Sequence, residues 1–245
     1  MTNYKWLLLD ADNTLFDFTA AEDFALTRTL IRFGESVSDE IKAGYRKINA
    51  ALWVAHDKGE LDQNALGPKR FRLFHTAFGI QGNPVEWNTF YLNALADCPT
   101  LIPGAESLCR RLSERYILAL TTNGVPFVQW RRLEKSPLAR YFKKDRVFIS
   151  GEMDCRKPQK AYFDKVLEAL GVRTHRSQVL VIGDSLSSDI RGAFNAHLDS
   201  VWIHWPSAKP GIVKPTYEVE NLAQLAQLLS VDRYVPLDPD QMFRS

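Results

Sequence analysis

Five short apolar blocks recur along the chain and predict its strands. They are WLLL at 6–9, YILALTT at 116–122, RVFIS at 146–150, VLVIG at 179–183 and SVWIHW at 200–205. Unbroken apolar runs of this length are typical of parallel strands that are buried on both faces. Helical patterns lie between them: PGAESLCRRLSER begins with Pro103, and KAYFDKVLEALG ends with Gly171. Strands that alternate with helices predict an α/β fold with a Rossmann-like, doubly wound parallel sheet.

The segment 19–96 breaks this alternation, because it contains amphipathic helical patterns and no strand pattern. Gly, Pro and Asn separate four candidate helices: AAEDFALTRTLIRFG, SDEIKAGYRKINAALWVAHDKG, PKRFRLFHTAFG and PVEWNTFYLNALAD. We therefore predict a discontinuous α/β core of 1–18 and 97–230, with a helical domain of 19–96 inserted after the first strand. Residues 231–245, which are punctuated by Pro and Asp, are expected to form a C-terminal tail.

Composition and charge exclude several classes of protein. The 245 residues are 45% hydrophobic and 24% charged, which is globular and excludes wholesale disorder and collagen-like fibres. A net charge of +2 gives no global attraction to polymeric nucleic acid or to a membrane. Cys98, Cys109 and Cys155 fit neither a disulfide framework nor a zinc site. Because no signal peptide or long apolar span is evident, we expect a cytoplasmic protein, as a monomer or a homodimer.

Carboxylates mark the end of the first predicted strand. Asp10 and Asp12 lie in DADNTL, and alternation along an extended chain points both side chains the same way. Two carboxylates on one face repel each other, so the arrangement requires a cation or a shared proton. The structural alternative is an Asx-rich turn that caps a helix.

Three further polar elements follow other predicted strands. Thr122 and Asn123 end YILALTT, where a hydroxyl and backbone N–H groups suit an anion, although an ordinary N-cap is the alternative. Lys157 precedes Pro158, which favours an extended backbone that aims the ammonium group; a solvated lysine is the alternative.

The last element is GDSLSSD at 183–189, in which Asp184 stands at a strand end and Asp189 lies about one turn beyond it. A carboxylate at this place can bind Mg²⁺ or can cap the next helix. Parallel strands share one carboxyl edge, so these elements are expected to converge on one small volume.

This set and order of motifs resemble the haloacid dehalogenase-like hydrolase superfamily. The resemblance rests on D-x-D-x-T at 10–14, the strand that ends at Thr122, Lys-Pro at 157–158 and G-D-x-x-x-x-D at 183–189. The helical insert is similar to the C1 cap of that superfamily. The strings DADNTLF, NAALWVAHDKGEL, KRF and ALTTNGV further resemble the bacterial pyrimidine 5′-nucleotidase branch, which dephosphorylates nucleoside monophosphates, including non-standard ones.

The resemblance implies a phosphatase that works through an aspartyl phosphate. Asp10 would be the nucleophile, and Asp12 the general acid and then the general base. Mg²⁺ would be bound by Asp10, by the backbone carbonyl of Asp12 and by Asp184. Asn13 replaces the glycine that often follows the second aspartate, and asparagine tolerates unusual backbone angles.

The resemblance also implies how the phosphoryl group is held. Asp10, Thr122, Asn123 and Lys157 would contact it, while Asp189 would orient Lys157 or a metal-bound water. The substrate would be a small phosphomonoester, and contacts from the helical insert would select it.

Asn49, Trp53 and Arg70 are the candidates for this selection, with Trp53 placed to stack on a base. Phe71, Phe74 and Phe78, at helical spacing, are expected to pack in a core.

The sequence leaves three other functions open. A sugar-phosphate or other small-metabolite phosphatase would share the core and differ in its insert. A 2-haloacid dehalogenase is disfavoured, because those relatives lack the second aspartate. A phospho-acceptor without catalytic turnover would not need an insert of this size.

Overall fold

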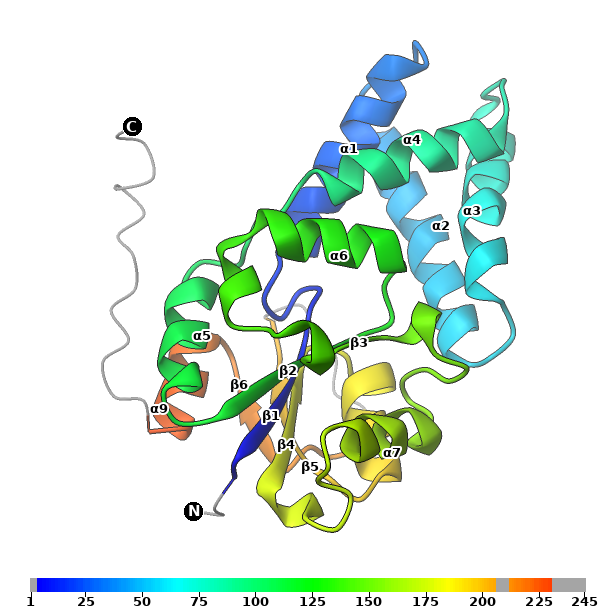
Figure 1. Cartoon of the computed structure of the whole chain (residues 1–245). Coiled ribbons are helices and arrows are strands. Elements are labelled where there is room, and N and C mark those ends of the chain that lie inside the picture. Colours follow the sequence, from blue (N-terminus) through cyan, green and yellow to red (C-terminus); the bar gives the residue numbers. More distant parts are fainter. Residues whose placement is uncertain (1–3, 206–211, 231–245) are drawn as a thin grey trace, which may run out of the picture. The chain divides into compact units, whose positions relative to one another are not determined.

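The computed structural model describes residues 4–205 and 212–230, and in this part of the chain six strands form one parallel sheet (Figure 1). The strand order is β3-β2-β1-β4-β5-β6, which is the doubly wound arrangement that the sequence predicts. The bounds are β1 Trp6–Asp10, β2 Ile117–Thr122, β3 Val147–Ile149, β4 Val179–Gly183, β5 Asp199–Ile203 and β6 Tyr217–Val219. Each predicted apolar block overlaps one of the first five strands to within one or two residues at each end, whereas β6 was not predicted.

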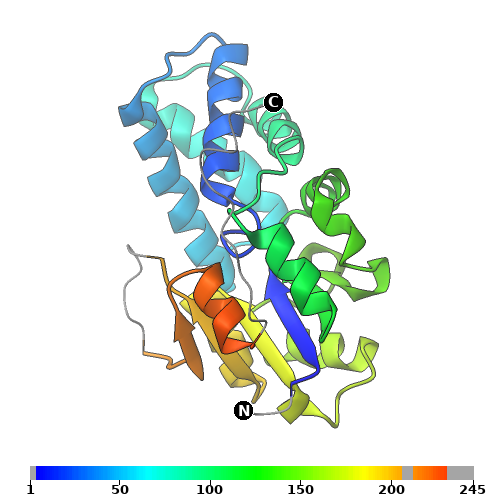
Figure 2. The same cartoon turned by 90° about the vertical axis from the view of Figure 1, so that its left-hand side faces the viewer.

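Helices cover both faces of this sheet. Side chains alternate along a strand, so Leu8 faces one side while Leu7 and Leu9 face the other, and all three are fully buried. The Leu8 side packs against α7 (Lys160–Ala169) and α8 (Arg191–Asn195) through an apolar cluster that includes Phe163 and Ala193. Helices α5 (Ala105–Ser113) and α9 (Leu222–Leu228) contact each other and lie side by side over the sheet in Figure 2.

The described chain divides into two compact units. One holds the sheet and consists of the described parts of 1–17, 101–124 and 136–245; the other is helical and consists of 18–100 and 125–135. The helical unit contains α1 (Phe18–Arg32), α2 (Asp39–Asp57), α3 (Gln63–Phe78), α4 (Pro84–Ala96) and α6 (Pro126–Lys135). The first four match the helices expected in 19–96, although α3 begins five residues before the predicted start at Pro68.

Helix α6 lies in the segment that the sequence assigns to the core, and the structure groups it with the helical unit instead. Val128 joins the apolar cluster of that unit. Arg131 and Lys135 both pair with Asp97, each at 2.6 Å. Packing and ion pairs thus tie α6 to the end of α4, a link between distant parts of the chain.

An aromatic cluster forms the centre of the helical unit. Tyr45, Phe71, Phe74 and Tyr91 are fully buried, and the ring centroids of Phe71 and Tyr91 lie 5.6 Å apart. Phe78 is partly buried against this cluster, so the packing role expected for the three phenylalanines is confirmed.

The expected tail, 231–245, lies outside the described residues. Within them, no helix combines the length and the apolar character needed to cross a bilayer.

Candidate active site

Three adjacent strands end at the site. Asp10 is the last residue of β1, which lies between β2 and β4 in the sheet. Thr122 is the last residue of β2, and Asp184 follows β4 directly. The parallel pairing places all three ends at one edge, and the structure therefore brings these residues of distant sequence together.

The ammonium group of Lys157 joins two of the acidic segments. Its Nζ lies 2.6 Å from Oδ1 of Asp10 and 2.6 Å from Oδ1 of Asp189, and it donates to the carbonyl of Thr121 at 3.0 Å. The residue is 1% exposed. An ammonium group has three N–H donors, and here each has an acceptor. Burial would lower the pKa of Lys157, but the carboxylates of Asp10 and Asp189 raise it above its usual value.

The amide of Asn123 holds the backbone of Lys157 from both sides. Asn123 Nδ2 donates to the Lys157 carbonyl at 2.9 Å, and the Lys157 N–H donates to Asn123 Oδ1 at 3.1 Å. The sequence predicted Asn123 as a phosphate contact and did not predict this reciprocal pair. Residues 34 positions apart carry no local signal of such a contact.

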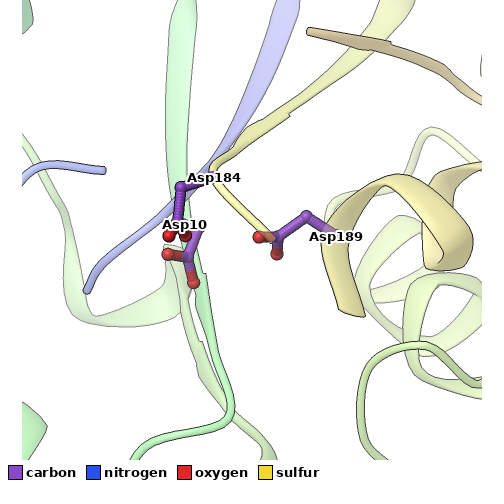
Figure 3. A group of neighbouring side chains, drawn as sticks. All are labelled: Asp10, Asp184 and Asp189. Atoms are coloured by element: carbon purple, nitrogen blue, oxygen red, sulfur yellow. The ribbon is translucent and has the colours of Figure 1, made fainter. Parts of the chain in front are cut away.

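Asp10, Asp184 and Asp189 form an acidic cluster (Figure 3). One carboxylate oxygen from each lies within 4.8 Å of the others. Asp189 belongs to the helical turn Leu186–Ile190 and is 1% exposed. Its second oxygen, Oδ2, accepts the N–H of Ser185 at 3.1 Å. Because Lys157 and Ser185 already bond to Asp189, Asp10 and Asp184 are the better pair for an additional cation.

The cluster holds more negative than positive charge. Burial raises the pKa of Asp10 to about 7, with Lys157 lowering it and Asp189 raising it. Burial, followed by the charges of Asp10 and Asp189, raises the pKa of Asp184 well above its usual value. A cluster of three carboxylates, with Asp10 and Asp189 buried and Asp184 half-buried, around one ammonium fits a hard divalent cation, which would keep the acids ionised.

Gly183 leaves the space that Asp189 occupies. A Cβ atom built on Gly183 would lie 2.3 Å from Oδ2 of Asp189, a distance that real contacts do not reach. We expect Gly183→Ala to displace Asp189 and to lower the free energy of unfolding by about 1–3 kcal/mol. Urea unfolding monitored by circular dichroism measures this. An unchanged unfolding midpoint would show that the loop has room for the methyl group.

The loop after β1 turns sharply at Asn13. Asn13 has a φ of 57°, in the left-handed region that asparagine tolerates, and its N–H donates to the carbonyl of Phe16 at 2.8 Å. Asp12 lies close enough to raise the pKa values of both Asp10 and Asp184. The turn therefore keeps the second aspartate beside the acidic cluster.

Thr122 makes the turn contact that the structural alternative predicted. Its Oγ1 accepts the N–H of Gly124 at 3.0 Å, and the residue is 2% exposed. This contact uses the hydroxyl as an acceptor, so its hydrogen can still be donated to an anion.

Comparison with known proteins shows the family of this chain. The model of the haloacid dehalogenase-like hydrolase family matches residues 4–197. The chain belongs to this family. It is therefore an enzyme of the hydrolase class, and the six-stranded sheet described above is the family's Rossmann-like core.

Three similar proteins span nearly the whole hydrolase. The HAD-hydrolase YfnB of Bacillus subtilis is 33% identical over 96% of this chain and 99% of its own length. The pyrimidine 5′-nucleotidase YjjG of Escherichia coli is 34% identical, covering 92% of this chain and 98% of its own. The pyrimidine 5′-nucleotidase PynA of Streptococcus pneumoniae is also 34% identical, with 92% and 95% covered.

The fold of YfnB has also been solved in a crystal bound to magnesium. It matches this hydrolase with a TM-score of 0.86 and 34% identity, covering 93% of this chain and 99% of that one. The agreement extends over both the sheet and the helical insert, because the match leaves little of either chain out.

Two of the three residues expected to select the substrate lie in the interior of the helical unit. Asn49 and Arg70 are each 3% exposed. Arg70 donates to Oδ1 of Asn49 and to Oδ1 of Asn88, both at 2.9 Å, and its guanidinium carbon lies 4.6 Å from the Tyr91 ring centre. Asn49 in turn donates to Glu22 at 2.6 Å. The structure thus gives both residues internal partners.

Trp53 differs from them, because it is only partly buried. Its ring lies 5.5 Å from that of His56, edge to face. Sequence reasoning missed Glu22 and Asn88, which complete the buried network. A glutamate among the small apolar residues of AAEDFAL was the available signal for the first.

Neutralising Glu22 is expected to stabilise the helical unit near neutral pH. Burial raises the pKa of Glu22 above its usual value, and this exceeds the lowering by Asn49 and Arg70. A carboxyl group with a higher pKa in the folded than in the unfolded state stabilises the fold at pH values below its unfolded pKa. This stabilisation is lost as the pH rises through its folded pKa. Glu22→Gln should therefore raise the urea midpoint at pH 7.5, with a smaller gain near pH 4.

The control is Glu60→Gln in the same unit, an exposed position where we expect little change at either pH. A lower midpoint for Glu22→Gln at pH 7.5 would contradict this prediction, because it would mean that the attraction to Arg70 outweighs the cost of burial.

Proposed function

We propose that this hydrolase is a Mg²⁺-dependent phosphomonoesterase, a 5′-nucleotidase that acts on pyrimidine nucleoside monophosphates. The observation that carries the proposal is the buried ammonium of Lys157 between Asp10 and Asp189, next to Asp184. This arrangement supports a scheme in which Asp10 is the nucleophile, Lys157 is the cationic donor, and Asp10 and Asp184 together bind a cation. The nucleotide preference is supported by the two pyrimidine 5′-nucleotidases among the similar proteins.

The first chemical step is a displacement at phosphorus. Lys157 holds one carboxylate oxygen of Asp10, and the other attacks the phosphorus in line. A bond forms between that oxygen and phosphorus, and the bond from phosphorus to the leaving oxygen breaks. Asp12 gives its proton to the leaving oxygen, so the nucleoside departs neutral. Covalent catalysis of this kind divides one difficult displacement into two easier ones.

The second step returns the enzyme to its starting state. Asp12, now ionised, takes a proton from water, and the water oxygen attacks the phosphorus of the aspartyl phosphate. Phosphate leaves, and the Asp10 carboxylate is restored. Lys157 and the Thr122 hydroxyl bind phosphoryl oxygens in both steps, while Asp189 orients Lys157.

Mg²⁺ fits the donor set and would be bound by Asp10, Asp184 and the backbone carbonyl of Asp12. When bound, it supplies positive charge against the phosphoryl oxygens and keeps the carboxylates ionised. The assignment is supported by the excess of three carboxylates, two buried and one half-buried, over the single ammonium of Lys157.

Selection of the leaving group is assigned to the helical insert. Trp53 is the candidate that stacks on the base, because its indole is only partly buried. Asn49 lies four residues before it on α2, so the bonds from Asn49 to Glu22 and Arg70 fix the helix that carries Trp53. We assign Asn49 and Arg70 to this supporting role.

A substrate panel tests the proposal. Phosphate release is measured from pyrimidine and purine nucleoside monophosphates and from sugar phosphates, with Mg²⁺, with a chelator, and after Mg²⁺ is restored. We expect pyrimidine nucleotides to be hydrolysed fastest and activity to be lost reversibly on chelation. Preference for sugar phosphates would overturn the nucleotidase assignment and leave the catalytic scheme intact. Full turnover with the chelator would contradict the scheme.

A further inference from the structure

Two tryptophans at the end of β5 donate hydrogen bonds to the acidic loops of other strands. Nε1 of Trp202 donates to the backbone carbonyl of Asp184 at 2.8 Å. Nε1 of Trp205 donates to the backbone carbonyl of Asn13 at 2.9 Å. Asp184 is itself a member of the acidic cluster, and Asn13 directly follows Asp12. No step of the scheme above uses either indole.

Trp202 is fixed by its surroundings. It pairs in register with Gly183 of β4 and is 6% exposed, packed against Ile190 and Val213. Its N–H therefore approaches Asp184 from the neighbouring strand with little freedom. The carbonyl that it holds belongs to the first residue beyond β4, where the ladder of the sheet ends.

Trp205 is held through the extension of β5. The N–H of His204 donates to the carbonyl of Val219 at 2.9 Å, so the chain stays tied to β6 up to the residue before Trp205. The carbonyl that Trp205 holds belongs to the left-handed turn at Asn13. A left-handed residue costs energy in an ordinary chain, and partners on both sides of it hold this turn.

The geometry of an indole suits it to holding a backbone carbonyl in one direction. It is a rigid ring with one donor and no acceptor, so its N–H fixes the direction of a carbonyl without competing for the acids. A small displacement of catalytic groups can cost a large factor in rate. Backbone contacts that fix both acidic loops therefore bear directly on the chemistry.

We propose that Trp202 and Trp205 are positioning residues for the phosphatase reaction, whose indole N–H groups hold the backbone of the Asp184 and Asp12 loops. The role of each follows from the residue that it holds. Trp202 maintains Asp184 for cation binding, and Trp205 maintains Asp12 for proton transfer. The role of Trp205 rests on the proposed function, because it is measured by the rate of phosphate release. The role of Trp202 rests on Mg²⁺ binding at the acidic cluster.

The test replaces each tryptophan with phenylalanine, which keeps an aromatic ring and removes the N–H. For Trp205→Phe we expect kcat to fall about tenfold with KM within about twofold, the loss typical of one hydrogen bond. For Trp202→Phe we expect the Kd for Mg²⁺ alone, measured by calorimetry without substrate, to rise about tenfold. Loss of packing alone would lower Tm and leave these values unchanged.

Trp6→Phe is the matched control. Trp6 begins β1, at the opposite end of the strand from Asp10, with Arg146 5.9 Å from its ring centre. We expect its kcat and Mg²⁺ affinity to stay within about twofold of the wild type, the scatter of a neutral substitution. If phenylalanine prevents folding, 3-benzothienylalanine at the same position keeps the bicyclic shape and replaces only the N–H.

Each result counts for or against one residue. An unchanged kcat in Trp205→Phe overturns the role of Trp205, and an unchanged Mg²⁺ Kd in Trp202→Phe overturns that of Trp202. A wild-type enzyme that binds Mg²⁺ but hydrolyses no phosphomonoester would overturn the proposed function instead. In that case the Mg²⁺ affinity of Trp202→Phe still tests whether Trp202 maintains the cation site.

Discussion

Replacing Asp10 with asparagine should reduce phosphate release by at least about 10⁴-fold, because the substitution removes the carboxylate that we propose as the nucleophile. An amide oxygen is a poor nucleophile towards a phosphate ester, and no other side chain in the scheme can take its place. The remaining groups bind and orient the substrate, so we expect a low residual rate. Single-turnover phosphate release with the preferred nucleotide measures the loss.

The fold should survive this change. Asparagine has nearly the shape of aspartate, and Lys157 keeps its ion pair with Asp189 at 2.6 Å. The matched control is Asp199→Asn at the start of β5, where the carboxylate accepts the Tyr4 hydroxyl at 2.7 Å. The control should retain nearly full activity. An Asp10→Asn enzyme that is folded and within about tenfold of the wild type would exclude Asp10 as the nucleophile.

Replacing Lys157 with methionine should reduce both activity and stability. The substitution removes the cation that the proposed scheme assigns to the phosphoryl oxygens, for which we expect a loss of about 10³-fold in kcat. It also leaves Asp10 and Asp189 buried without their partner, and breaking a buried pair costs about 3–5 kcal/mol. Phosphate release and urea unfolding measure the two effects on the same preparation.

A double variant separates these effects. Lys157→Met with Asp189→Asn removes the isolated charge at Asp189, so part of the lost stability should return while activity stays low. Lys165→Met is the control, because Lys165 pairs with Asp154 on an exposed surface and should change neither property much. If the double variant regained activity together with stability, Lys157 would be a structural residue only.

The strands and the acidic residues could be predicted from the sequence because their signals are local. Each apolar block needs burial on both faces, which is visible in four to seven consecutive residues. The carboxyl edge of a parallel sheet then brings Asp10 and Asp184 together without further information. The short strand β6, which has the sequence YEV and one exposed residue, lacks this signal.

The contacts within the site depend on packing that no local pattern records. The amide of Asn123 bonds to the backbone of Lys157, and Gly183 is needed because Asp189 comes so close to it. The first contact joins residues that are far apart in the sequence. The second depends on how the loop after β4 folds back towards the end of that strand.

Packing within the helical insert could not be predicted from sequence patterns either. Amphipathic spacing indicates which face of a helix is buried and not what covers it, so the grouping of α6 with the insert could not be predicted. Polar side chains such as Asn49 and Arg70 are ordinarily exposed because burial costs free energy unless partners are present. Glu22 and Asn88 provide those partners here, and only the folded structure shows them.

Covalent trapping tests the central claim most directly. In the proposed scheme an Asp12→Asn enzyme lacks the general acid and should form the aspartyl phosphate more slowly. It should hydrolyse this intermediate more slowly still, because the base that activates water is also absent. After incubation with substrate and Mg²⁺ and an acid quench, mass spectrometry of the peptides should locate one phosphoryl group on Asp10. A phosphoryl group on another residue, or none under conditions where the first product has been released, would contradict the account.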